Sequence, residues 1–109
     1  MIKVVLVDDQ ELMRVGFRMV LGAQEDMEIV GEAGNGQEAV DLAARLRPDV
    51  VLMDVRMPGM DGLEATKHIV EKVPDTAVLI FTAYSERSLL SRGLESGAKG
   101  YILKEAPHQ

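Results

Sequence analysis

The chain has 109 residues and no cysteine, so it can form one domain with a single core but no disulfide framework or thiolate metal site. The net charge of −6 and the aromatic content of 4%, without tryptophan, argue against direct binding of nucleic acid by this piece. No apolar run approaches the roughly 20 residues of a membrane span, and no signal peptide is evident. We therefore expect a cytoplasmic protein with no membrane contact.

Two kinds of element alternate along the chain. Short β-branched and apolar runs predict five strands, over 2–8, 27–33, 49–54, 76–83 and 99–104. Apolar residues at helical spacing predict four helices between them, over 10–23, 34–48, 61–74 and 85–98. Asp61 and Glu64 have the spacing of a capping box, and Ser85 and Gly97 are the expected cap residues of the fourth helix. This alternation predicts an α/β fold with a parallel sheet that helices cover on both faces.

Polar side chains follow several of the predicted strands at their carboxyl ends, where open α/β sheets form their ligand crevice. They are Asp8, Asp9, Asp54, Thr82 and Lys104. Any one of them alone would most often cap a helix or face water. Three carboxylates together repel one another, however, and a hard cation such as Mg²⁺ removes that repulsion. A lysine and a threonine hydroxyl beside them can bind an anion.

This set of side chains suits the transfer of a phosphoryl group to a carboxylate. Asp54 is the best candidate for the nucleophile, because it stands alone at the tip of the central strand and can form an acyl phosphate. The adjacent pair Asp8 and Asp9 suits metal binding. The metal and Lys104 would then neutralise charge on the transferring group.

Four stretches occur in the order and approximate spacing of a known family: VLVDDQ (5–10), VVLMDVRMPGMDG (50–62), FTA (81–83) and GYILK (100–104). Over its whole length the chain resembles the receiver domain of bacterial two-component response regulators. Two longer stretches are similar to the LuxR/NarL-type subfamily, whose output is a helix-turn-helix DNA-binding domain: MDVRMPGMDGLEAT (53–66) and SGAKGYILKEA (96–106). The resemblance implies a flavodoxin-like, doubly wound sheet with strand order 2-1-3-4-5. It also implies a phosphorylation-dependent switch in transcription regulation, not a turnover enzyme.

The resemblance assigns a role to each acidic residue. Asp54 would accept a phosphoryl group from a phosphohistidine of a sensor histidine kinase. Asp8 and Asp9 would bind Mg²⁺ directly or through water, together with Asp54 and the backbone carbonyl of Arg56.

The resemblance also assigns the switch residues. Thr82 would move toward the phosphoryl group, Lys104 would form an ion pair with it, and Tyr101 would turn inward as Thr82 moves. The chain departs from many receivers directly after Lys104, where Glu105 stands in place of a proline.

The family fold has five helices, whereas this sequence stops after the fifth predicted strand. With right-handed connections the first helix covers one face and the next three cover the other, so a fifth helix would have joined the first. We therefore expect a receiver domain over 1–109, shortened after the fifth strand. We also expect it to self-associate through the face formed by the first helix and the fifth strand.

Other interpretations remain open. A phosphatase of the haloacid dehalogenase type also uses an aspartate nucleophile and Mg²⁺, but it needs a second aspartate where this chain has Arg56. A flavodoxin-like FMN binder would need a hydroxyl-rich or glycine-rich loop where this chain has DDQELM (8–13). A receiver-like scaffold that never accepts phosphate would be expected to lack some of these acidic residues. The absence of a GxxxxGK[ST] run excludes a P-loop NTPase.

Overall fold

The computed structural model of the chain describes residues 1–55, 57–82, 95 and 97–103. Its strands are β1 (Ile2–Val7), β2 (Met27–Ala33), β3 (Val50–Asp54), β4 (Ala77–Thr82) and β5 (Gly100–Leu103). Its helices are α1 (Glu11–Gly22), α2 (Gly36–Leu46) and α3 (Gly62–Lys72). All described strand pairs are parallel, and the strands lie in the order β2-β1-β3-β4-β5. The predicted α/β class is confirmed, whereas the helix predicted over 85–98, with its Ser85 cap, lies outside the described residues.

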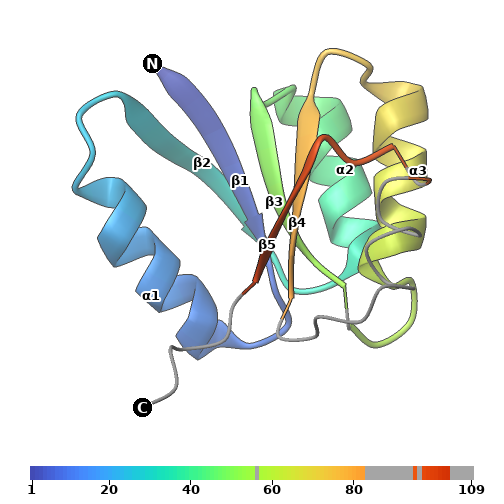
Figure 1. Cartoon of the computed structure of the whole chain (residues 1–109), viewed down its shortest axis with the longest axis horizontal. Coiled ribbons are helices and arrows are strands. Elements are labelled where there is room, and N and C mark those ends of the chain that lie inside the picture. The colour runs from blue at the N-terminus through green and yellow to red at the C-terminus, as the bar shows by residue number, and fades with distance from the viewer. Residues whose placement is uncertain (56, 83–94, 96, 104–109) are drawn as a thin grey trace.

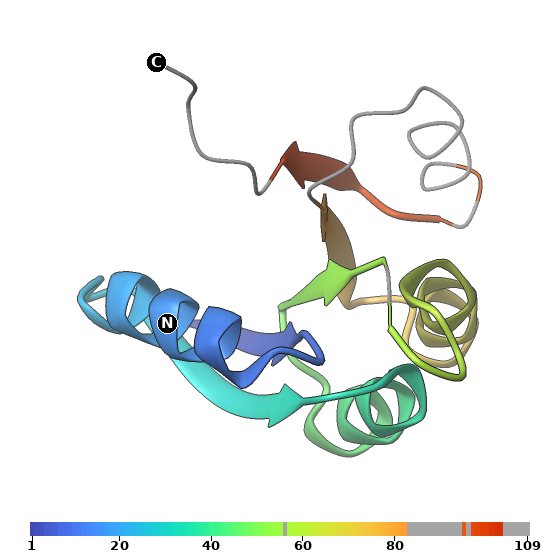
Figure 2. The ribbon, with the colours of Figure 1, turned by 90° about the horizontal axis from the view of Figure 1, so that it is seen from below.

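Different helices cover the two faces of the sheet. α1 lies on one face, and α2 and α3 lie side by side on the other (Figures 1 and 2). β2 lies on one side of β1, whereas β3 and β4 lie on its other side. The connections therefore run in opposite directions across the sheet, and because they are right-handed, α1 lies on one face and α2 and α3 lie on the other. None of the helices in the described part of the chain combines the length and apolar character needed to cross a membrane.

The core on the α1 side is small and aromatic. Its buried residues are Val4, Leu6, Leu52 and Phe81. Phe17 of α1 packs against Phe81 of β4, with ring centroids 4.8 Å apart and planes inclined at 59°. This tilted arrangement is one that aromatic pairs prefer. It ties α1 to β4.

The core on the opposite face is larger. It combines alternate residues of the central strands, among them Val5 and Met53, with the inner faces of α2 and α3. α2 contributes Ala39 and Ala43, and both are fully buried. Because alanine is small, the helix backbone can lie close to the sheet. This face therefore holds the carboxyl ends of β1 and β3 in a tightly packed setting.

Side-chain caps fix the starts of the two helices on this larger core. The Asp61 side chain accepts a hydrogen bond from the Glu64 amide at 2.9 Å, as its spacing predicts. Asn35 does the same for α2, accepting from the Glu38 amide at 2.9 Å. The Glu38 carboxylate reaches back to the amide of Gly34, also at 2.9 Å. Both helices therefore begin at residues that a side-chain cap defines.

Candidate functional site

The acidic residues predicted to act together meet at the carboxyl edge of the sheet. Val7 of β1 pairs with Met53 of β3, so the next residue of each chain segment, Asp8 or Asp54, lies at the same level. Carboxylate oxygens of Asp8, Asp9 and Asp54 all lie within 4.8 Å of one another. Neighbouring parallel strands thus deliver the three carboxylates to one point. We call this set the acidic cluster.

Burial distinguishes the members of the acidic cluster. Asp8 is 1% exposed and Asp54 is 5% exposed, whereas Asp9 is exposed. Removing a carboxylate from water is costly unless other groups replace the lost hydration. For Asp8 the backbone provides part of this replacement, because its Oδ1 accepts a hydrogen bond from the Gln10 amide at 2.9 Å. The cluster is therefore anchored on its inner side and open to solvent at Asp9.

The donor set of the cluster fits a hard divalent cation. Carboxylate oxygens are the ligands that Mg²⁺ prefers, and this ion usually keeps several waters and binds through one or two protein carboxylates. Three carboxylates within reach of one another meet that need, and Asp9 is exposed to the solvent that would supply water ligands. Arg56, whose backbone carbonyl was predicted as a further ligand, lies outside the described residues.

The loop that follows Asp54 folds back against the strand it leaves. The amide of Gly62 donates to the carbonyl of Val55 at 2.9 Å. A Cβ built on Gly62 would lie 1.9 Å from the carbonyl oxygen of Asp54. Similarly, a Cβ on Gly36 would lie 2.5 Å from the carbonyl oxygen of Met60. The two glycines therefore let the loop between β3 and α3 pass close to the site without a steric clash.

The other predicted residues are placed only in part. Asp54 pairs with Phe81, so the backbone of Thr82 reaches the same edge of the sheet one residue later. Tyr101 pairs with Ile80 in β5. The side chains of Thr82 and Tyr101, and the whole of Lys104, lie outside the part of the chain that the structure describes. Their roles remain predictions.

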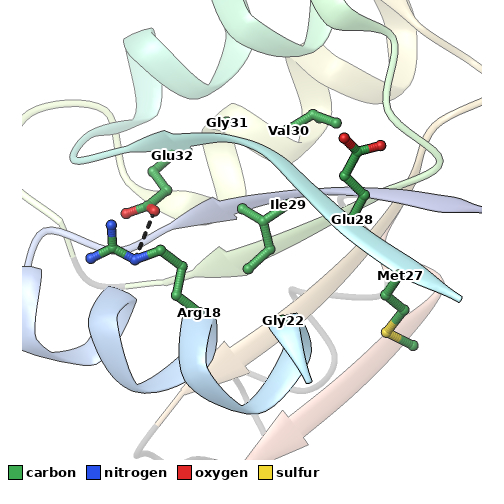
Figure 3. Close-up of a pocket in the computed structure, with 8 residues that line it drawn as sticks. All are labelled: Arg18, Gly22, Met27, Glu28, Ile29, Val30, Gly31 and Glu32. Carbon is green, nitrogen blue, oxygen red and sulfur yellow. Dashed lines mark ion pairs between the residues drawn. The ribbon is translucent and has the colours of Figure 1, made fainter. Parts of the chain in front are cut away.

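The structure adds a group of residues that the sequence did not reveal. Arg14 of α1 donates from Nη1 to the backbone carbonyl of Asp8 and from Nε to Oε1 of Glu32, the latter at 3.2 Å. Arg18 binds the other oxygen of the same carboxylate, also at 3.2 Å (Figure 3). Arg14 and Arg18 are four residues apart, so they share one helix face. The sequence shows this spacing. It does not show which acidic residue the two arginines bind, because that depends on the tertiary structure.

Comparisons with known proteins agree with this geometry. The response regulator receiver domain family matches residues 4–109, and the chain belongs to this family. The chain is 48% identical over 108 residues to the oxygen regulatory protein NreC of Staphylococcus carnosus. That alignment covers 98% of this chain and 50% of NreC, and the chain spans about half the length of the curated relatives it matches.

Solved structures give the same assignment. The signal receiver domain of NarL from Mycobacterium tuberculosis is 36% identical with a TM-score of 0.90, and the match covers 97% of this chain and 86% of that one. The complex of CheX and CheY with BeF3 and Mg²⁺ from Borrelia burgdorferi is 28% identical with a TM-score of 0.90, covering 97% and 80%. The predicted family and its LuxR/NarL-type subfamily are confirmed. The chain is a signalling receiver domain of the kind found in transcriptional regulatory proteins.

Proposed function

We propose that Asp54 is the phosphoacceptor of a Mg²⁺-dependent switch that a sensor histidine kinase phosphorylates. The observation behind this proposal is the acidic cluster, in which Asp54 ends the central strand within 4.8 Å of two further carboxylates. A structural neighbour was solved as a complex with BeF3 and Mg²⁺, which supports Mg²⁺ as a ligand of this fold. Receiver-family membership also weighs against the phosphatase and flavin alternatives.

The chemistry assigns different tasks to the three carboxylates. An oxygen of Asp54 forms a bond to phosphorus, and the bond from phosphorus to the donor's imidazole nitrogen breaks, with the electron pair staying on the imidazole. Mg²⁺ held by Asp8, Asp9 and Asp54 would neutralise the charge on the phosphoryl oxygens. Asp8 is anchored by the Gln10 amide, so it can act as a fixed ligand, whereas exposed Asp9 can bind the metal directly or through water.

The remaining roles follow from family membership. Lys104 would form an ion pair with the phosphoryl group, and the backbone carbonyl of Arg56 would complete the metal ligands. Thr82 would move toward the phosphoryl oxygens, and Tyr101 would turn inward in response. The added charge at Asp54 would in this way shift the surface around Tyr101 from one conformation to another. The backbone positions of Thr82 and Tyr101 on adjacent strands support this coupling.

The wider context is part of the same proposal. The chain acts in the cytoplasm and signals to a DNA-binding output domain, and this piece does not bind DNA directly. Its negative net charge and the names of its relatives as transcriptional regulatory proteins support this division of tasks.

Phosphorylation by a small donor tests the proposal. The 109-residue chain is incubated with acetyl phosphate and Mg²⁺, and its intact mass is measured. We expect one added phosphoryl group that is lost with EDTA present and in Asp54→Asn. Asp75→Asn, which removes an exposed acid far from the cluster in sequence, is the matched control and should be phosphorylated as fully as the unmodified chain. If the folded unmodified chain forms no adduct, a receiver-like scaffold without phosphate chemistry is the better description.

A further inference from the structure

Asp8 is held in place through its backbone as well as through its side chain. Its amide donates to the carbonyl of Ala33 at 3.0 Å, and its own carbonyl accepts from Nη1 of Arg14. Its Oδ1 accepts from the Gln10 amide. Three hydrogen bonds therefore fix the residue that connects β1 to the acidic cluster, and one of them comes from a side chain of α1.

The guanidinium of Arg14 is itself held by the edge strand. Its Nε binds Oε1 of Glu32 in β2 at 3.2 Å. The two side chains are only 19% and 23% exposed, so water screens this pair less than it screens an ordinary surface ion pair. The guanidinium also lies beside the loop after β2, because a Cβ built on Gly34 would be in ordinary van der Waals contact with Nη1 of Arg14, at 3.6 Å. A planar guanidinium offers donors in a fixed fork, and here two branches reach two different elements.

We propose that Arg14, clamped by Glu32, is the positioning residue of the acidic cluster. It fixes the carbonyl of Asp8 and thereby the direction in which the carboxylates of Asp8 and Asp9 point. Partners outside the metal ligands commonly set ligand orientation and affect metal affinity and activity in this way. This inference rests on the proposed function of the cluster. Arg14 would act through the backbone of Asp8, which its Nη1 contacts, and not as a ligand of the cation.

The substitution Arg14→Lys tests whether the cluster depends on the contacts of the Arg14 side chain or only on its positive charge. Arg14→Lys keeps the positive charge near the cluster, but an ammonium group cannot reproduce the forked contact with both Asp8 and Glu32. Arg18→Lys is the matched control, because Arg18 lies on the same helix and binds the same carboxylate (Figure 3). The contact given for Arg18 is the one from its Nε to Oε2 of Glu32, at 3.2 Å.

The experiment measures Mg²⁺ affinity by calorimetry and the initial rate of phosphorylation by acetyl phosphate, after urea unfolding has shown that each variant is folded. For Arg14→Lys we expect the Mg²⁺ dissociation constant to rise by about tenfold. The phosphorylation rate should fall most at low Mg²⁺ and recover in part at saturating Mg²⁺. Arg18→Lys should stay within about twofold of the unmodified chain in both measurements.

A second variant covers the case in which Arg14→Lys does not fold. Glu32→Gln leaves Arg14 in place but weakens its clamp, so the Mg²⁺ dissociation constant should again rise, by less than in Arg14→Lys. If the unmodified chain is phosphorylated while these variants match Arg18→Lys in Mg²⁺ affinity and rate, the positioning role is wrong and the proposed function stands. If the unmodified chain neither binds Mg²⁺ nor forms an adduct, the proposed function fails and this inference fails with it.

Discussion

Gly62 begins α3 directly against the backbone of Asp54. A Cβ at this position would meet the Asp54 carbonyl oxygen at 1.9 Å and the Cα of Val55 at 2.9 Å. Real Cβ atoms do not approach backbone atoms so closely, and neither contact is the flexible end of a side chain that could move aside. The absence of a side chain at this residue therefore allows the cap of α3 and the end of β3 to lie together.

We predict that Gly62→Ala destabilises the fold by about 1–3 kcal/mol, since either the strand end or the helix start must shift. Gly16→Ala is the matched control, because Gly16 lies inside α1 and a Cβ there meets nothing within 4 Å. That change should instead stabilise the fold by about 0.5–1 kcal/mol through helix propensity. Urea unfolding followed by circular dichroism measures both. Equal free energies of unfolding for the two variants would contradict the close approach at Gly62.

At the level of elements, the helices differ in how they start. α2 and α3 each begin with a side-chain cap, whereas Gln10 at the start of α1 makes no side-chain capping hydrogen bond. α1 also has no fully buried residue, while α2 buries four. α2 is therefore fixed both at its start and along its inner face, and α1 depends more on its packing through Phe17 and on its arginines.

The cap of α2 gives a prediction at this scale. Asn35→Ala removes the acceptor of the Glu38 amide and should lower the free energy of unfolding by about 1 kcal/mol. Asn35→Asp keeps an acceptor and adds a negative charge at the helix start, so its stability should stay close to that of the unmodified chain. Urea midpoints compared at equal m-values measure the difference. A loss in Asn35→Asp as large as in Asn35→Ala would contradict the capping role.

Most elements could be predicted from the sequence because their signals are local. β-branched runs and capping residues place the described strands and helices within a few residues of the predicted bounds. The acidic cluster was predictable because its members follow strands directly, and the carboxyl ends of parallel strands meet at one edge. The bridge from Arg14 to Asp8 and Glu32 was not predictable. It depends on the tilt of α1 over the sheet, which no local pattern contains.

At the scale of the whole molecule, α1 carries several large apolar side chains that are exposed to solvent. Leu12, Met19 and Val20 are 82%, 73% and 64% exposed. Leu12 and Met19 are seven residues apart and therefore share one side of α1, and Val20 directly follows Met19. Neighbouring apolar side chains at a surface are typical of an interaction site. The sequence predicts self-association through the face formed by α1 and β5, and these side chains give α1 an exposed apolar surface for such a contact.

We therefore predict that the mean mass of the chain in light scattering rises above the 11.9 kDa of the monomer as concentration increases. Met19→Lys should reduce that rise, because it places a charge within the exposed apolar face. Gln37→Lys makes the same change in net charge on an exposed position of α2 and should leave the association unchanged. A monomer at all concentrations, or equal effects of the two substitutions, would show that α1 does not mediate self-association.

The pairing of Val7 with Met53 also fixes when the acidic cluster can form during synthesis. Protein chains grow from the N-terminus at about 5–20 residues per second and fold as segments emerge. β1, α1 and β2 are complete before β3 has been made, and until then one side of β1 is an unpaired strand edge. The same event, the arrival of β3, both covers that edge and brings Asp54 beside Asp8. A nascent chain therefore acquires its acidic cluster only when β3 pairs with β1.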